Sequence, residues 1–367
     1  MIIAYVLDDT LDKTDGVQQY VTTVGEHMRS LGHEVHYVVG KTLRTDLKHI
    51  HSVATLFSTR FNGNTVRTPL PTRAKHIKKV VERIHPDVVH IQLPTSPLFG
   101  ARLLARLPAS TRVIGTWHTF PATGLQRYAN KVLSIGLRSS LRRINHFVAV
   151  SKPTADFAKD CYGVDSTVIP NAVSLHTFET KQPIDKKPTI LFLGRFVERK
   201  GPRLLIAALA ELARAGIGMP RVVMGGSGPQ LKTCQSLSKR LGLEVEFTGF
   251  VPERDKPAFL SRATIAVFPS TSGEAFGISL VEAMAGGHSI VVGGNNPGYA
   301  SILGKQQLLL INPKHTTRFA DTLRMLLTLP PSEQRKLSQW LKREAQQYDT
   351  PVVCAKLLRL YAVRDHS

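Results

Sequence analysis

The loop at residues 270–277 carries Glu274, and Glu282 follows eight residues later. The apolar run before this loop, residues 263–268, predicts a buried strand, and the apolar spacing after it predicts a helix that ends near Gly286. Backbone N–H groups at the start of such a helix can bind a phosphate, and carboxylates beside them can accept hydrogen bonds from sugar hydroxyls. A helix cap with a surface glutamate would give the same pattern, so this stretch alone leaves both interpretations open.

Arg195 and Lys200 lie in a second loop, residues 194–201, which follows an apolar run at 190–193. Ligands of open α/β sheets bind outside the carboxyl ends of the strands, so we expect these cations at the same edge as Glu274. A departing nucleoside diphosphate needs its charge neutralised, and fixed cations can do this. The alternative is a pair of surface basic residues on a basic chain.

His118 and Thr119 follow an apolar run at residues 113–117 in the first half of the chain. A lone histidine is often structural, but its place at a strand end favours a functional role. Gly16 stands between the first apolar run, residues 2–7, and the first helical pattern, where a residue without a side chain lets a ligand approach the backbone.

The elements that must position these residues alternate between strands and helices in two successive sets. We therefore predict an α/β protein with two Rossmann-like, doubly wound domains that face a cleft. The first domain spans residues 1–180, residues 181–188 form a linker rich in prolines and charges, and the second domain spans residues 189–348. A further helix is expected within residues 349–367.

Length, charge and cysteine content exclude several classes of protein. The chain has 367 residues, which suits two domains, and a formal charge of +21, which predicts attraction to polyanions. Its three cysteines lie far apart, which favours neither a disulfide framework nor a zinc site. The sequence begins without a signal-peptide pattern and holds no apolar stretch long enough to cross a bilayer.

Taken together, the motifs resemble the retaining glycosyltransferases of family 4, which have the two-Rossmann GT-B fold; the bacterial phosphatidylinositol mannosyltransferases are the most similar. The likeness covers nearly the whole chain, and its motifs occur in family order: Gly16-Val17-Gln18, His118-Thr119, Val150-Ser151, Ile169-Pro170-Asn171, Gly194-Arg195 with Lys200-Gly201, Gly226 to Pro229, and Glu274 to Glu282.

The resemblance implies a hexose transfer from a nucleotide sugar, such as GDP-mannose or a UDP-hexose, with no metal and no cofactor. It makes His118 and Glu274 the catalytic candidates, with Glu274 on the donor sugar, and it returns the last helix to the first domain. Donor binding falls to Gly16, Arg195, Lys200, Gly226, Val251, Glu274, Phe276, Gly277, Ile278 and Glu282. Acceptor binding falls to Gln18, Asn62, Arg67 and Thr119.

Two differences from the mannosyltransferases lie on the acceptor side. Residues 120–123 lack the lysine that helps to hold the acceptor phosphate in those enzymes, and Asp9 stands where an aromatic residue is expected. Both differences argue against an inositol lipid. A membrane lipid or glycolipid is the expected acceptor, with mannose or glucose as the transferred sugar.

Basic residues are concentrated in the first domain. Residues 41–147 hold 18 of them against three acidic residues, and two predicted amphipathic helices, at about 73–84 and 125–143, carry many of these charges. Such helices bind anionic membrane surfaces, so we expect a cytoplasmic protein peripheral to the inner face of the cell membrane. A solvated basic face is the alternative.

Three other functions fit less well. A nucleotide-sugar epimerase of the same fold would have no acceptor site, and a soluble glycosyltransferase would act on a non-lipid acceptor. A nucleic-acid-binding protein is suggested by charge alone, without a matching motif or aromatic residues among the basic runs, so no nucleic-acid partner is expected. A Rossmann dehydrogenase would show Gly-x-Gly-x-x-Gly after residues 2–7, and this chain does not.

Overall fold

The structure is a computed structural model, and it divides into two compact units. Unit 1 is Met1–Ala172 with Thr350–Ser367, and unit 2 is Val173–Asp349. The structure describes the chain apart from residues 13–14, 62–63, 70–73, 96–98, 122, 180–186, 217, 288 and 364–367, and it describes no side chains for residues 56–61, 64–69 and 74.

The described part of unit 1 contains a seven-stranded parallel sheet in the order β3-β2-β1-β6-β7-β8-β9. A two-stranded antiparallel hairpin, β4-β5, accompanies it. The strands are β1 Ile2–Leu7, β2 Glu34–Gly40, β3 Ile50–Ala54, β4 Leu56–Phe61, β5 Asn64–Pro69, β6 Val88–Gln92, β7 Arg112–Trp117, β8 His146–Ala149 and β9 Thr167–Val168.

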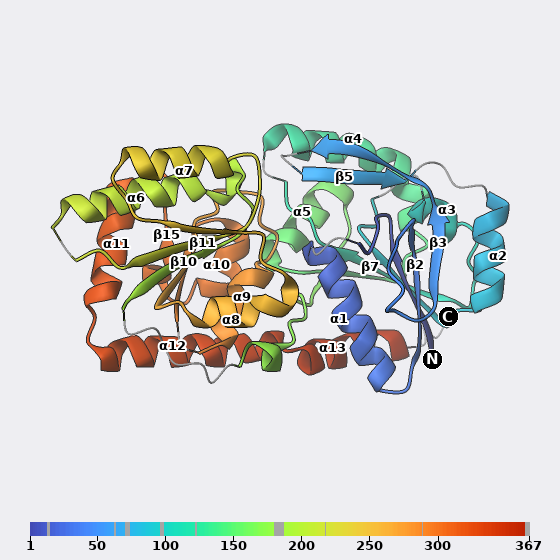
Figure 1. Ribbon diagram of the computed structural model, residues 1–367. Helices are drawn as coiled ribbons and strands as arrows, with labels where there is room; N and C mark the ends of the chain where they lie inside the picture. The colour runs from blue at the N-terminus through green and yellow to red at the C-terminus, as the bar shows by residue number, and fades with distance from the viewer. Residues whose placement is uncertain are drawn as a thin grey trace. The chain divides into compact units, whose positions relative to one another are not determined.

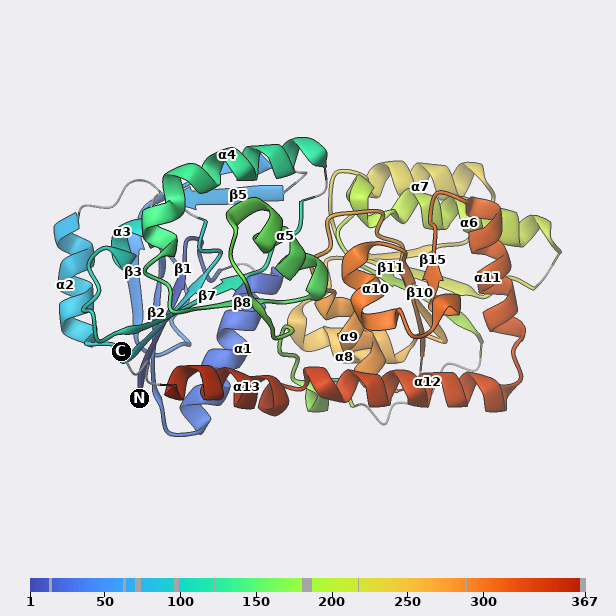
Figure 2. The ribbon, with the colours of Figure 1, turned by 180° about the vertical axis from the view of Figure 1, so that it is seen from behind.

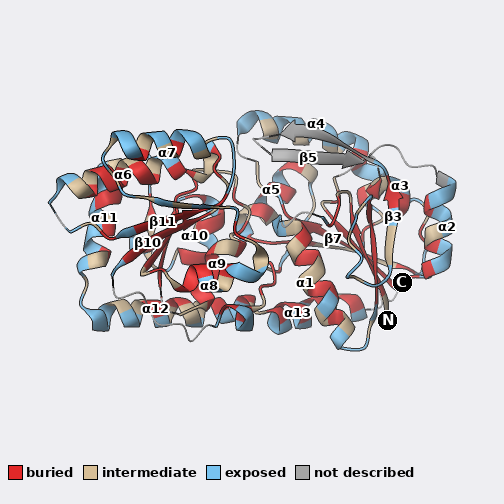
Figure 3. Cartoon of the chain, in the orientation of Figure 1, coloured by how far each residue is buried: buried red, intermediate tan, exposed pale blue. Residues whose placement is uncertain are grey.

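Both faces of this sheet are covered by helices, as the apolar strands require (Figure 3). Alternate residues of β1 point to opposite faces: Tyr5 joins a core cluster with α1 and α13, whereas Val6 joins one with α2, α3 and α4. The helices are α1 Gly16–Ser30, α2 Ala74–Ile84, α3 Gly100–Leu104, α4 Gly124–Leu141, α5 Lys152–Tyr162 and α13 Thr350–Ala362.

Helix α13 packs alongside α1 within unit 1 (Figures 1 and 2). The Tyr361 hydroxyl lies 2.6 Å from Nδ1 of His90, whose Nε2 lies 2.6 Å from the Thr116 hydroxyl. Burial lowers the pKa of His90 to about 3, so the ring is neutral and offers one donor and one acceptor. These two hydroxyl contacts therefore satisfy a wholly buried imidazole and join α13 to the sheet.

The change Tyr361→Phe should lower the free energy of unfolding by ~1–3 kcal/mol, because it leaves one nitrogen of the buried His90 without a partner. Urea denaturation measures this loss. The control is Lys356→Ala, at an exposed position of the same helix. Equal stability of the two variants would show that the hydroxyl contact does not hold α13.

Unit 2 contains a six-stranded parallel sheet in the order β12-β11-β10-β13-β14-β15. Every residue of its central strands, β10 and β13, is buried, so both faces are covered. The strands are β10 Thr189–Leu193, β11 Arg221–Gly225, β12 Glu246–Gly249, β13 Ile265–Phe268, β14 Ile290–Gly294 and β15 Leu310–Ile311.

The helices of unit 2 form two groups. Helix α6 contacts α7 and α11, while α9 contacts α8 and α12. The α-helices are α6 Pro202–Arg214, α7 Leu231–Arg240, α8 Lys256–Ser261, α9 Ile278–Ala285, α10 Pro297–Leu303, α11 Thr316–Thr328 and α12 Pro331–Ala345. The short 3₁₀ segments are η1 Leu175–Phe178, η2 Glu198–Lys200, η3 Glu253–Asp255, η4 Gln307–Leu309 and η5 Gln346–Tyr348.

The predicted fold class, two doubly wound α/β units with the last helix returned to the first, is confirmed by these sheets and by the place of α13. The structure differs from the sequence reading in residues 41–69, where β3, β4 and β5 occupy a stretch without a regular pattern. Residues 181–186 of the predicted linker lie outside the described residues.

Candidate active site

Glu274 lies between β13 and α9 and forms the centre of a charged network in unit 2. Only 9% of the residue is exposed, and its Oε1 accepts hydrogen bonds from Nη1 of Arg199 at 2.6 Å and from the Ser270 hydroxyl at 2.7 Å. Nζ of Lys200 lies 2.8 Å from the same oxygen. The structure thus brings the predicted residues Glu274 and Lys200 into direct contact.

The loops that carry this network are tied together through their backbones. Thr271 N–H donates to the carbonyl oxygen of Arg199 at 2.8 Å, and the Ser270 hydroxyl, whose one proton is shared with Glu274, lies 2.9 Å from the same carbonyl oxygen. Gly201 has a φ of +67°, and a Cβ there would lie 2.2 Å from the carbonyl oxygen of Pro269. A glycine is therefore required where the β10–α6 loop meets the end of β13.

The carboxylate of Glu274 is ionised at neutral pH. Burial acts to raise the pKa of Glu274, but Lys200 and Arg199 outweigh it and lower that pKa to about 2. Burial lowers the pKa of Lys200, against the opposing effect of Glu274. Arg195 also lowers the pKa of Lys200, which indicates that a further cation acts on this network.

Glu282 lies on α9 and is completely buried, with both carboxylate oxygens 3.4 Å from Nζ of Lys256. The same Nζ lies 2.7 Å from Glu253. Burial acts to lower the pKa of Lys256, and the two carboxylates overcome this effect and raise it. The sequence reading did not single out Lys256, because nothing in its spacing connects it to Glu282.

Helix α9 begins after Gly277, whose carbonyl oxygen accepts hydrogen bonds from the N–H groups of Leu280 and Val281. The N–H groups before them have no partner inside the helix, as at every helix start. Phe276 is buried with its ring 5.2 Å from that of Tyr348, and Ile278 is also buried. Their backbones are thus the groups that can contact an anion.

Gly226 marks a close approach between the loops after β10 and β11. Its φ is +133°, and a Cβ there would lie 1.8 Å from the carbonyl oxygen of Gly194. Its N–H donates to the carbonyl oxygen of Gly249 at 2.6 Å. The carboxyl ends of β10, β11 and β12 therefore meet at a position without side chains, directly before Arg195.

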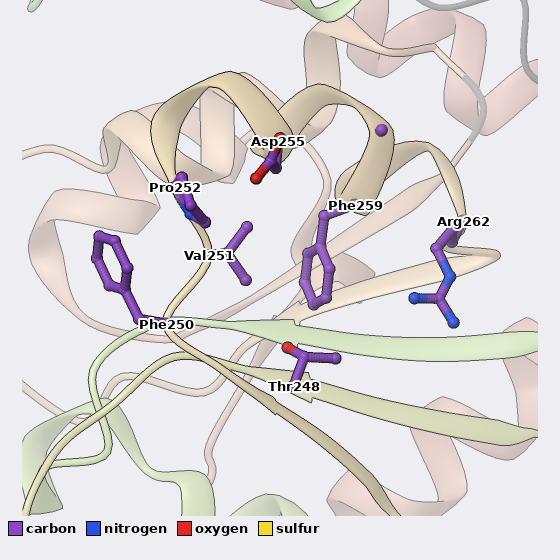
Figure 4. A pocket seen from close by; sticks show the side chains of 8 residues that line it. Thr248, Phe250, Val251, Pro252, Asp255, Phe259 and Arg262 are labelled. Carbon is purple, nitrogen blue, oxygen red and sulfur yellow. The ribbon is translucent and has the colours of Figure 1, made fainter.

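A pocket of about 380 Å³ lies between the end of β12 and α8 (Figure 4). The ring of Phe250 stands at one end of this pocket and the guanidinium of Arg262 at the other. Phe250 is largely exposed, whereas the predicted donor residue Val251 is buried beside it. Thr248, Pro252, Asp255, Ala258 and Phe259 complete the lining.

His118 follows β7 in unit 1 and is buried, with 8% of the residue exposed. Its Nε2 lies 2.7 Å from Oε1 of Gln92, the last residue of the neighbouring strand β6. Burial lowers the pKa of His118 to about 3, against a smaller opposing contact with Asn171. The imidazole is therefore neutral at physiological pH.

The contact with Gln92 determines the tautomer of His118. An amide oxygen only accepts hydrogen bonds, so Nε2 carries the proton and Nδ1 carries the lone pair. Nδ1 is buried and has no hydrogen-bond partner among the residues that the structure describes. His118 can thus accept a hydrogen bond from a ligand hydroxyl, and Gln92, which sequence reasoning missed, holds it in this state.

The structure describes some of the predicted site residues of unit 1 but not all of them. Gln18 is buried on α1 and donates from Nε2 to Oδ2 of Asp9 at 3.2 Å, while Gly16 and Thr119 are exposed at the carboxyl edge of the same sheet. Asn62 lies outside the described residues. The side chain of Arg67, on β5, is also outside them.

Two family profiles together match residues 14–347. The profile of glycosyltransferase family 4 matches residues 14–177, and that of the glycosyl transferases group 1 matches residues 176–347. A phosphatidyl-myo-inositol mannosyltransferase from Propionibacterium freudenreichii subsp. shermanii is 31% identical over 99% of this chain and 95% of its own length. The enzyme of the same name from Mycobacterium tuberculosis is 27% identical, over 98% and 96%.

Solved structures agree on the fold. Anabaena Alr3699/HepE in complex with UDP and glucose matches with a TM-score of 0.75 and 18% identity, over 99% of this chain and 100% of that one. A glycosyltransferase from Rickettsia africae matches with a TM-score of 0.75 and 18% identity, over 98% and 97%. These proteins are glycosyltransferases of the GT-B fold, which confirms the predicted architecture.

This chain belongs to glycosyltransferase family 4. The resemblance seen in the sequence motifs and the predicted enzyme class, a glycosyltransferase, are both confirmed. Within the described part of the chain, no helix has the combination of length and hydropathy that a transmembrane span requires.

The stabilising effect of Glu274 should depend on pH. The pKa of its carboxyl falls from an ordinary value of 4.5 to about 2 on folding, so its contribution is present above about pH 4.5 and is lost as the pH falls further. The stability advantage of wild type over Glu274→Gln should therefore shrink below pH 4.5, by up to ~1.4 kcal/mol per pH unit.

Urea denaturation between pH 6 and pH 3.5 measures this advantage. The variant Glu244→Gln, at an exposed position of unit 2, reports what the loss of a surface carboxylate does under the same conditions. A wild-type advantage over Glu274→Gln that stays constant through this range would contradict the assigned charge state.

Proposed function

We propose that this enzyme transfers a hexose, with mannose preferred, from a nucleotide sugar to a membrane lipid or glycolipid, with retention and without a metal. The observation that carries the proposal is the cation network around Glu274 at the carboxyl edge of the unit 2 sheet. Mannose and a lipid acceptor are supported by the activity that the names of the full-length relatives state.

In this proposal the donor lies along the loops of unit 2. The base occupies the pocket next to Phe250 and Val251, where an exposed aromatic ring and a buried aliphatic side chain offer a flat apolar surface. Glu282, held by Lys256, accepts hydrogen bonds from the ribose. GDP-mannose and a UDP-hexose both meet these requirements, and GDP-mannose is favoured by the name of a further relative, the GDP-mannose-dependent alpha-(1-6)-phosphatidylinositol monomannoside mannosyltransferase of Mycobacterium tuberculosis.

The diphosphate is assigned to Arg195, Lys200 and the first N–H groups of α9. Negative charge grows on the leaving group as the glycosidic bond breaks, and preorganised cations stabilise that charge without further rearrangement. Glu274 holds Lys200 and Arg199 in place before the donor arrives. We infer retention and metal independence from the family resemblance together with this supply of positive charge.

Glu274 and His118 are assigned to the transferred sugar. Glu274 has an ionised carboxylate at the carboxyl edge of unit 2 that can accept from sugar hydroxyls. The unpartnered Nδ1 of His118 can accept another hydroxyl hydrogen, because Gln92 holds the proton on Nε2. A neutral, fixed imidazole binds a sugar hydroxyl without repelling the basic groups of the donor site.

The acceptor is assigned to unit 1, at Gln18 and Thr119, together with Asn62 and Arg67 from the sequence resemblance. The carboxylate of Asp9, which accepts from Gln18, suits a headgroup that presents hydroxyls. An epimerase of the same fold remains the rival, since it would use the donor without an acceptor. The assay below separates the two.

Helix α4 supports docking to an anionic membrane. The structure shows that α2 and α4 differ in whether their apolar residues are exposed. The apolar residues Ile77 and Val81 of α2 are buried in the core, and the described residues of α2 that are exposed are all polar or charged. On α4, by contrast, Leu125, Tyr128 and Ile135 are 78%, 67% and 65% exposed.

These exposed residues of α4 recur at helical spacing and form one apolar stripe with Val132. Arg127 and Lys131 lie next to the stripe and pair with Asp160, while Arg138 is exposed nearby. An apolar stripe bordered by cations is the pattern of a helix that lies in the lipid interface. We infer that α4 inserts shallowly and that α2 adds long-range attraction.

The function is tested by a panel of nucleotide sugars against a total membrane lipid extract, with mass spectrometry of the products. Incorporation of one hexose into a lipid, from GDP-mannose first, is the expected result. Phosphatidylinositol, added alone, tests the inositol lipid directly. An altered nucleotide sugar formed without lipid would establish the epimerase instead, and no product with any donor would overturn the proposal.

Replacement of Arg195 or Lys200 by alanine should lower kcat about 10²-fold or more, because one lost electrostatic contact to a transition-state charge costs ~3 kcal/mol. The matched control is Lys239→Ala, an exposed lysine on α7. Steady-state kinetics at saturating donor measures kcat. Unchanged turnover in both active-site variants would remove these cations from the mechanism.

The double variant Leu125→Ser with Ile135→Ser should weaken binding to anionic vesicles at all salt concentrations, because it removes apolar area from the interface. Lys78→Ser with Lys79→Ser should weaken binding mainly at low salt, where screening is least. Vesicle co-sedimentation over a salt series distinguishes the two effects. Equal binding of wild type to neutral and anionic vesicles would contradict the electrostatic part.

A further inference from the structure

Three histidines and a glutamate gather at the edge of the unit 1 sheet that is opposite to the proposed active site. Glu34 and His36 alternate on the first residues of β2 and therefore point to the same face. His49 directly precedes the neighbouring strand β3, and His51 is its second residue. The two strands pair in parallel, which brings the four side chains together.

The ring of His36 stands at the centre of this cluster. The ring centroid of His49 lies 4.7 Å from it with the planes 21° apart, and that of His51 lies 5.2 Å away at 24°. Nε2 of His36 is 2.9 Å from Oε1 of Glu34, and Nδ1 is 2.9 Å from Nε2 of His51. Both nitrogens of this buried ring therefore have a polar partner.

The spacing of the outer groups suits a metal ion. One ligand atom each from Glu34, His36 and His49 lies within 4.8 Å of the other two. Bonds of about 2.0–2.1 Å to a tetrahedral zinc ion put ligand atoms about 3.3 Å apart, so small side-chain rotations close the set. Glu34 and His49 are exposed, which leaves them free to rotate and leaves the ion a path of entry.

We propose that Glu34, His36 and His49 bind a divalent transition metal ion, of which zinc fits best, with His51 as the residue that orients His36. Two imidazoles and one carboxylate form a common protein set for zinc and leave a fourth position for water. The proposed ligands include one acidic residue and no cysteine. The site lies where the amino ends of the strands meet, so its expected role is structural.

The contact between His36 and His51 gives the cluster a way to change from its metal-free to its metal-bound state. Without metal, Nε2 of His36 must carry a proton to contact the carboxylate, and Nδ1 then accepts from His51. With metal on Nε2, His36 carries its proton on Nδ1 and donates it to Nε2 of His51, whose own proton then lies on its Nδ1. Ligating histidines usually donate their second N–H in this way.

The local charges also allow binding. The cations that face the cluster are Arg29, which acts on His36 and is paired with Glu26, and Arg83, which acts on His51. The carboxylate of Glu34 provides the negative charge that a dication requires.

A metal at this site would join β2 to the edge strand β3. β3 stands at the end of the described sheet and pairs with one strand, β2. The chain between β3 and β6 contains the hairpin β4-β5 and, among the described helices, α2. An ion that binds the folded arrangement and not the unfolded chain raises stability in proportion to its binding. Metal binding and thermal stability should therefore change together.

The experiment uses the full-length protein without a purification tag, treated with a chelator and dialysed. Isothermal titration with ZnCl₂ should show one site with a Kd in the micromolar range or below, and the Tm should rise with zinc but not with magnesium. Cobalt substituted for zinc should give the visible absorption bands of a four-coordinate site. The matched control is His76→Ala, an exposed histidine on α2 outside the cluster.

The variants His49→Ala and Glu34→Gln change exposed side chains, so they should fold as wild type and lose at least ten-fold in zinc affinity. His51→Phe should lose 10–100-fold, because it removes the partner of His36 but no ligand. The proposal is overturned if wild type shows no zinc site, or if His49→Ala and Glu34→Gln bind zinc as tightly as His76→Ala. A zinc-dependent Tm rise that persists in these variants would likewise place the metal elsewhere.

Discussion

The parallel direction of the strands is the constraint on which the chemistry of this enzyme depends. In the seven-stranded and the six-stranded sheets every pairing between neighbouring strands is parallel, so the carboxyl ends of their strands share one edge. Gln92 and His118 end two adjacent strands of unit 1, and the loops after β10 and β13 carry Lys200 and Glu274 in unit 2. Residues far apart in the chain become neighbours because the strands before them are neighbours.

Arg199 and Lys200 are held in place by the carboxylate of Glu274 before any ligand binds. Two cations contact one oxygen of the buried Glu274 carboxylate. Removal of one partner from a buried ion pair lowers the free energy of unfolding by more than the intact pair adds to it, because a buried charge is left without a partner. Lys200 is therefore an oriented group rather than a flexible lysine, which is what the proposed binding of a diphosphate requires. The same principle holds in unit 1, where an amide without charge orients His118.

The sequence was sufficient for the fold class and for the loops that carry the site, because buried parallel strands appear as apolar runs and each is followed by its loop. It did not reveal that Arg199 pairs with Glu274, or that Lys256 pairs with Glu282, since pairing between loops depends on backbone geometry. The strands β3, β4 and β5 were missed because polar residues interrupt each of them, so none forms a continuous apolar run. Helical periodicity shows an apolar face on both α2 and α4, but only packing shows which face is covered.

The return of α13 to unit 1 has a consequence for the synthesis of the protein on the ribosome. The core of unit 1 includes Cys354, Leu357 and Tyr361, yet all of unit 2, Val173–Asp349, is translated before them. Unit 2 is continuous in sequence and can fold as soon as it emerges, whereas the sheet of unit 1 must wait with one apolar groove open. During that interval the nascent first unit exposes the apolar surface that α13 covers later, so its core can be completed only after α13 has been translated.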